Sequence, residues 1–169
     1  MVYVLGCNHG IQPRDEDWLG GDSPAAKEQK THFAELIKHI IQAGSIQFVG
    51  EEWGLPEITT AHSHADACHI RWENINTSCE DLDRLGIARG YAKGNFTQAQ
   101  KEHWHSQREQ IMLRKLKESH REALNILVVC GFEHMESLVN LLRLAGWVVR
   151  TLDYRCMNWY QRGVFAEDP

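Results

Sequence analysis

One segment, VVCGFEHMESLVNLLRLAGWVV at residues 128–149, constrains the fold of this chain most strongly. Its first residues form a short apolar run typical of a buried strand, and the leucines that follow have the spacing of an amphipathic helix. Gly146 stands where a helix commonly ends, and the apolar residues after it predict another strand. We therefore predict a strand at 126–130, a helix at 135–145 and a strand at 147–152, which is the order of a βαβ unit.

The N-terminal part of the chain has the same order of elements. VYVLGC at 2–7 predicts a buried strand, and apolar residues at helical spacing predict a helix at 25–43 with Ser23 as its N-cap. A second short strand is expected at 46–49, and a glycine and two glutamates follow it directly.

The middle of the chain is expected to be mostly helical. TTAHSHADACH at 59–69 is a candidate helix start, and Thr77 or Ser78 is a candidate N-cap for a short helix. A long polar helix is predicted at 97–123. The aromatic tail at 154–169 is expected to pack on the body of the protein, and a partner-binding surface is the alternative.

Strands that alternate with helices are typical of an α/β protein whose sheet is parallel. We therefore expect an α/β fold of three layers, in which a mostly parallel sheet has helices on both faces. The chain of 169 residues shows no shift in composition that would mark a linker, so residues 1–169 are predicted to form a single domain.

Composition excludes some classes of function. The net charge of −5 argues against a nucleic-acid surface, because phosphate binding requires a basic patch. MVYVLGCNHG lacks the basic and long apolar regions of a signal peptide, and no apolar run is long enough to span a membrane. The five widely spaced cysteines are expected to be reduced thiols. We therefore expect a cytoplasmic protein without membrane or nucleic-acid partners, and oligomerisation stays open.

Four polar residues follow predicted strands, and they are the first candidates for a site. They are His9, Glu51, Glu52 and His134. Ligands of open α/β sheets bind beyond the carboxyl ends of the strands, so these side chains are expected to meet at one edge. Histidine and carboxylate suit a divalent metal, for which we name His9, Glu52 and His134, or an acid/base pair. Because adjacent residues of an extended segment face opposite sides, one glutamate rather than both is expected to point into the site.

Simpler interpretations remain open for each of these residues. A histidine after a strand is often a polar turn residue, and adjacent glutamates are often a solvated edge. A second group, His62, His64, Asp66 and His69, is either a metal site on a helical face or an exposed helix start. His103 and His105 are expected on different sides of the long helix, and Arg108 by its spacing alone is a surface charge.

Taken together, four short motifs resemble a known superfamily. They are GCNH (6–9), EE (51–52), REQIM (108–112) and GFEH (131–134), the last followed by a leucine-rich helix and GWVV. In this order they resemble the superfamily that includes erythromycin esterase, the haem-binding lipoprotein ChaN, the TraB/PrgY proteins and the Tiki metalloproteases. The agreement extends over nearly the whole chain.

This resemblance implies an α/β core with a pocket used for hydrolysis, sometimes with a metal, or for haem binding. It implies that His9 and His134 are metal ligands or catalytic bases, that Glu51 or Glu52 is a ligand or activates water, and that Arg108 holds an anion or carbonyl. We therefore expect a hydrolase of a small-molecule or peptide substrate. The alternatives are a haem- or metal-binding module without turnover and a regulatory interaction protein on the same fold.

Overall fold

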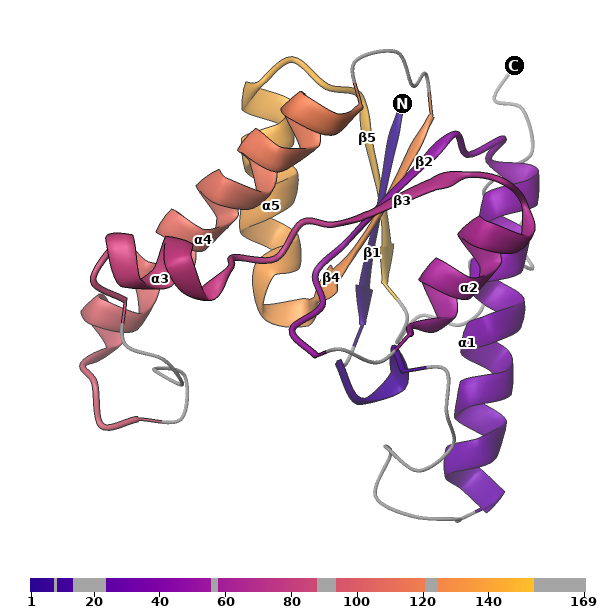
Figure 1. Cartoon of the computed structure of the whole chain (residues 1–169), viewed down its shortest axis with the longest axis horizontal. Helices are drawn as coiled ribbons and strands as arrows, with labels where there is room; N and C mark the ends of the chain where they lie inside the picture. Colours follow the sequence, from indigo (N-terminus) through magenta and orange to yellow (C-terminus); the bar gives the residue numbers. More distant parts are fainter. Residues whose placement is uncertain (8, 14–23, 56–57, 88–93, 121–124, 154–169) are drawn as a thin grey trace.

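A parallel sheet of five strands forms the centre of the protein (Figure 1). The computed structural model describes residues 1–7, 9–13, 24–55, 58–87, 94–120 and 125–153. The strands are β1 (Val2–Cys7), β2 (Phe48–Glu51), β3 (Arg71–Asn74), β4 (Ile126–Gly131) and β5 (Val149–Asp153). Their order in the sheet is β3-β2-β4-β1-β5, and every pair is parallel. The predicted parallel α/β fold is confirmed.

Helices cover both faces of this sheet (Figure 1). They are η1 (His9–Ile11), α1 (Pro24–Ala43), α2 (Thr60–Ala67), α3 (Cys79–Arg84), α4 (Gln98–Ser119) and α5 (Phe132–Leu144). α1 and α2 lie on one side, and α4 and α5 lie on the other. None of these helices is long and apolar enough to cross a lipid bilayer, within the ranges that the structure describes.

The two hydrophobic cores explain why the central strands are continuously apolar. Successive side chains of a strand point to opposite faces, so each central strand supplies residues to both cores. Leu5 packs in the core under α1 and α2, which includes Phe33. Its neighbour Val4 packs in the other core with Met112 of α4 and Leu138 of α5.

The structure differs from the sequence-based expectation in one additional strand and in the bounds of several elements. β3 was not expected, because it is a short, mostly polar strand at the sheet edge whose residues are exposed or only partly buried. It forms by pairing with β2. β2 ends at Glu51 rather than before it. α5 begins at Phe132 rather than 135, with Gly131 as its N-cap, so His134 lies in the first helical turn.

Several predicted helix ends are confirmed. Ser78 caps α3, and its hydroxyl accepts from the backbone N–H of Asp81 in a capping box. α5 ends before Gly146, whose φ of +87° is the left-handed conformation that glycine adopts without strain. The predictions for Ser23 and for the tail at 154–169 fall outside the described residues.

Candidate functional site

Four predicted site residues line one pocket at the carboxyl edge of the sheet. His9 follows β1, and Glu52 follows β2. His134 lies in the first turn of α5, just after β4, and Arg108 reaches the same pocket from α4. We call this cavity of about 320 Å³ the rim pocket. Its other lining residues are Trp53, Gly54, Leu55, Asn76, His105 and Glu133. Because β1, β4 and β2 are neighbours in the sheet, their carboxyl ends bring these side chains together.

Glu52 lies at the centre of the charged groups, and its side chain is only 2% exposed. One carboxylate oxygen, Oε1, accepts from Arg108 Nη2 at 2.9 Å and lies 3.4 Å from His134 Nε2. The other oxygen, Oε2, accepts from the Gly131 backbone N–H at 3.0 Å and lies 3.7 Å from His9 Nε2. Every group around this carboxylate is therefore a donor or a potential cation.

These contacts keep Glu52 ionised at neutral pH. Burial alone would raise the pKa of its carboxyl group, but the charges of His134, His9 and Arg108 and the Gly131 N–H outweigh burial, so the pKa is lowered. Arg108 also donates to the side-chain oxygen of Asn76 at 2.9 Å. The guanidinium group is thus fixed in orientation beside the pocket.

Glu51 lies on the opposite side of β2 and does not line the rim pocket. Its Oε1 accepts from Gln12 Nε2 at 3.0 Å, and its Oε2 accepts from the Thr59 hydroxyl and from the Trp72 indole N–H. Burial raises the pKa of Glu51 to about 7, although these hydrogen bonds oppose the shift. Both glutamates were candidates from the sequence, and one of them was expected to point into the site, because adjacent residues of an extended segment face opposite sides. The structure places Glu52 in the rim pocket and Glu51 outside it.

Gln12 connects Glu51 to His9 and determines which nitrogen of His9 carries a proton. The Gln12 Nε2 amide group donates to Glu51 Oε1 and to the backbone carbonyl of Glu52, at 3.0 and 3.2 Å. Its oxygen must therefore face His9 Nδ1, which lies 2.6 Å away. An amide oxygen only accepts, so Nδ1 carries the hydrogen. In neutral His9 the lone pair is then on Nε2, the nitrogen nearer to Glu52.

Gly131 leaves room for the imidazole ring of His9. A Cβ atom at this position would lie 2.6 Å from His9 Nε2 and 3.2 Å from Cε1. We expect Gly131→Ala to displace the ring and to cost about 1 kcal/mol, roughly the hydrogen bond to Gln12, because half-exposed His9 can rotate away. Imidazole NMR spectra and urea denaturation measure both effects.

The control for this variant is Gly146→Ala, far along the chain at the end of α5. A side chain there is strained by the positive φ, so it costs a similar ~1 kcal/mol without contacting His9. The His9 resonances should move in Gly131→Ala and stay in place in Gly146→Ala. Unchanged His9 resonances in Gly131→Ala would contradict the proposed close approach.

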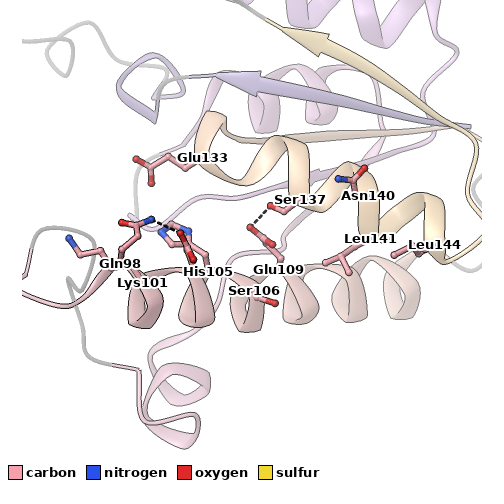
Figure 2. A pocket seen from close by; sticks show the side chains of 11 residues that line it. Gln98, Lys101, His105, Ser106, Glu109, Glu133, Ser137, Asn140, Leu141 and Leu144 are labelled. Atoms are coloured by element: carbon pink, nitrogen blue, oxygen red, sulfur yellow. Dashed lines mark hydrogen bonds between the residues drawn. The ribbon is translucent and has the colours of Figure 1, made fainter.

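His134 connects the rim pocket to a second group of residues between α4 and α5. Its Nε2 faces Glu52, while its Nδ1 lies 3.0 Å from Glu109 Oε1 and 3.4 Å from His105 Nδ1. Glu109 also accepts from the Ser137 hydroxyl at 2.6 Å, the contact drawn in Figure 2. Burial and the nearby charges of His134 and Arg108 lower the pKa of His105, so His105 is neutral at pH 7.

Four residues near the pocket were missed in the sequence analysis. They are Gln12, Asn76, His105 and Glu109. A usable signal existed for two of them, because His105 and Glu109 are four residues apart on a helix and Arg108 is three from His105, so all three share one face. No pattern in the sequence marked Gln12 or Asn76.

The second histidine group does not form the predicted helical face. His62 lies 3.4 Å from Asp66, one turn along α2, and its ring stacks on Trp72 with 3.9 Å between centroids. His69 lies beyond the end of α2 with a φ of +55°. His62, Asp66 and His69 therefore do not share a continuous helix, as a metal site of that spacing would require.

The chain was also compared with known proteins. No protein-family model, curated protein or solved structure matches it. The superfamily resemblance therefore stays a prediction, and the geometry alone carries the functional argument.

The predicted metal ligands His9, Glu52 and His134 fit a cation poorly. Glu52 Oε1 already accepts from Arg108, whose positive charge at 2.9 Å opposes a second cation on the same oxygen. Its Oε2 accepts from Gly131. The neighbouring group of His105, Glu109 and His134 offers ligand atoms within 4.8 Å of one another and could hold a metal ion.

Proposed function

We propose that this protein is a cytoplasmic hydrolase that acts on a small ester, amide or phosphoester in the rim pocket. One observation carries the proposal. Three groups meet at the carboxyl edge of a parallel sheet. They are His9, whose Nε2 lone pair takes no part in the hydrogen bond to Gln12, the buried and ionised carboxylate of Glu52, and the guanidinium group of Arg108. The resemblance to the erythromycin esterase superfamily agrees with this assignment.

In the proposed reaction, His9 Nε2 takes a proton from a water molecule as the water attacks the substrate. General-base catalysis of this kind typically contributes about 10²–10⁴-fold to the rate. Glu52, 3.7 Å from Nε2, stabilises the imidazolium that forms. Arg108 stabilises the negative charge that develops on the substrate oxygen. His134, held between Glu52 and Glu109, positions Glu52.

The size of the rim pocket favours a small substrate. Its volume of about 320 Å³ is near the lower end of the roughly 300–1,000 Å³ typical of small-molecule sites. Haem, the alternative ligand suggested by the resemblance, is a large macrocycle and fits this volume less well. A visible absorption titration with haemin tests the alternative directly, and a Soret shift that His9→Ala abolishes would favour haem binding.

The test of the hydrolase proposal is a panel of chromogenic esters, anilides and phosphoesters. We expect at least one activity, which His9→Ala lowers by about 10²-fold or more because the general base is lost. His103→Ala, an exposed histidine on α4, is the control and should keep full activity. A detected activity that survives His9→Ala and Arg108→Lys, in variants shown to be folded, would contradict the proposal.

A divalent metal ion is a candidate cofactor. The group formed by His105, Glu109 and His134 adjoins the rim pocket, since His105 and His134 also line it. A metal-binding module without turnover is therefore the second candidate function.

A further inference from the structure

We infer that His105, Glu109 and His134 bind one divalent cation of the zinc class between α4 and α5. The inference deepens the proposed function by naming a cofactor site beside the rim pocket. Metal binding is measured without substrate, however, so this inference can fail or succeed independently of hydrolysis.

The spacing of the ligand atoms matches a tetrahedral ion. Zinc lies about 2.0–2.2 Å from imidazole nitrogen and carboxylate oxygen, which places tetrahedral ligand atoms about 3.3 Å apart. In this structure His105 Nδ1 lies 3.4 Å from His134 Nδ1, and His134 Nδ1 lies 3.0 Å from Glu109 Oε1. The ligand atoms of the third pair, His105 and Glu109, lie within 4.8 Å of each other, so that pair must close toward 3.3 Å when an ion binds.

The neighbours of these ligands are those that metal sites usually have. A metal-bound histidine commonly donates its other ring N–H to a carboxylate, which fixes the ring and strengthens the ligand. With Nδ1 of His134 on the ion, its Nε2–H faces Glu52 Oε1 at 3.4 Å. The Ser137 hydroxyl likewise donates to the ligand oxygen of Glu109. Both supports are present in the part of the chain that the structure describes.

The ligand types select the class of metal. Two imidazoles and one carboxylate form the ligand set of zinc sites that keep a fourth position for water, whereas magnesium and calcium prefer oxygen ligands throughout. In the structure His134 Nδ1 forms a hydrogen bond with Glu109, so an ion displaces that hydrogen. That hydrogen moves to Nε2, the ring nitrogen that faces Glu52 Oε1.

The site is accessible from outside. A groove of about 750 Å³ runs between α4 and α5, and His105, Glu109 and Ser137 are among its lining residues (Figure 2). His105 and Glu133 line both this groove and the rim pocket. An ion held by His105 would therefore lie at the wall shared by the two cavities, beside space that water or a substrate can enter.

The experiment is a titration of the full chain, freed of metal by chelator dialysis, with Co²⁺ and then Zn²⁺. We expect the intense visible bands of tetrahedral cobalt to saturate at one ion per chain and to vanish when zinc displaces it. Isothermal calorimetry measures the affinity and the stoichiometry of zinc binding independently of the cobalt spectrum. Wild-type protein that shows no cobalt bands and no heat of zinc binding would overturn the inference.

Variants assign the ligands. His105→Ala removes a half-buried ligand, and Glu109→Gln keeps the shape of the buried one, so both should fold. Each should weaken zinc binding by about 100-fold or more. Ser137→Ala should weaken it by roughly 10-fold, the effect typical of losing a side chain that hydrogen-bonds to a metal ligand. His103→Ala, two residues from His105 but exposed, should bind like the wild type. Equal affinity in all four variants would overturn this ligand set.

The two proposals are distinguished by their own measurements. Zinc binding that His105→Ala abolishes, with no hydrolysis of any substrate in the panel, supports the metal site and contradicts the hydrolase. Hydrolysis that depends on His9 but occurs in protein that binds neither cobalt nor zinc supports the hydrolase and contradicts the metal site.

Discussion

Replacement of Arg108 by leucine is expected to lower the free energy of unfolding by about 3 kcal/mol at pH 7. Glu52 is ionised and 2% exposed, and Arg108 is its hydrogen-bonded cation at 2.9 Å. Removal of one partner of a buried ion pair leaves an uncompensated charge, which typically costs about 3–5 kcal/mol. We place the effect at the lower end, because Gly131 still donates to Glu52 and the histidines remain nearby. Urea denaturation followed by circular dichroism measures the change.

Arg114→Leu is the matched control, because Arg114 is on the same helix. Its side chain is half exposed, and it lies 3.7 Å from Asp81, so its ion pair is worth less than about 1 kcal/mol. A double variant, Arg108→Leu with Glu52→Gln, should recover part of the lost stability because it also removes the buried charge. Equal losses for Arg108→Leu and Arg114→Leu would contradict the central position of Glu52.

Glu51→Gln is expected to abolish a pH dependence of stability worth about 3 kcal/mol. The pKa of Glu51 is raised from 4.5 to about 7 in the folded protein, chiefly by burial. The native state therefore holds this proton more tightly than the unfolded chain, so the contribution of Glu51 to stability falls as the pH rises from about 4.5 to 7 and is constant above that. Each pKa unit corresponds to about 1.4 kcal/mol.

The measurement is the free energy of unfolding of both proteins between pH 4.5 and 8.5. Other titrating groups are shared, so the difference between wild type and variant isolates Glu51. The wild type should lose about 3 kcal/mol relative to Glu51→Gln across the window from 4.5 to 7. Parallel pH curves would show that the buried carboxyl group titrates normally and would contradict the expectation.

The same variant should also change His9, which it does not touch. A glutamine at position 51 that accepts from Thr59 and Trp72 must present its amide N–H₂ to Gln12. Gln12 must then turn its own oxygen toward position 51 and its N–H₂ toward His9 Nδ1, which reverses the present arrangement. We expect nitrogen-15 NMR to show the proton of His9 on Nε2 in Glu51→Gln. The rate of hydrolysis should then fall, because Nε2 no longer has a lone pair to accept a proton from water. An unchanged tautomer would contradict this chain of hydrogen bonds.

The class of fold could be predicted from local patterns. Buried strands and helices can be predicted from short stretches of sequence, because strand and helix periodicity depend on neighbours in sequence. The apolar runs at 2–7 and 126–130 and the leucines of α5 are examples. β3 could not be predicted in this way, since RWEN is polar and becomes a strand only by pairing with β2 at the edge of the sheet. The start of α5 was also missed, because its N-cap is a glycine without a side-chain hydrogen bond.

The candidate site was predictable in part for a similar reason. His9, Glu52 and His134 could be grouped because they follow strands, and parallel neighbours end at one edge. Arg108 was included only through the superfamily resemblance, and His105 was not grouped with the strand-end residues. Helix α4 approaches the sheet edge from elsewhere in the chain, and its direction depends on packing against α5 that no local pattern records.

Local sequence patterns thus determined most of the elements, the parallel order of the main strands and the edge of the sheet at which the polar side chains gather. Tertiary structure decided which glutamate faces the pocket, which nitrogen of His9 carries its proton, and where a cation would bind. These outcomes depend on contacts between distant segments, such as Gln12 with Glu51 and His134 with Glu109. Each outcome is decided by burial and by the few donors and acceptors within hydrogen-bonding distance. Both exist only once the chain is folded.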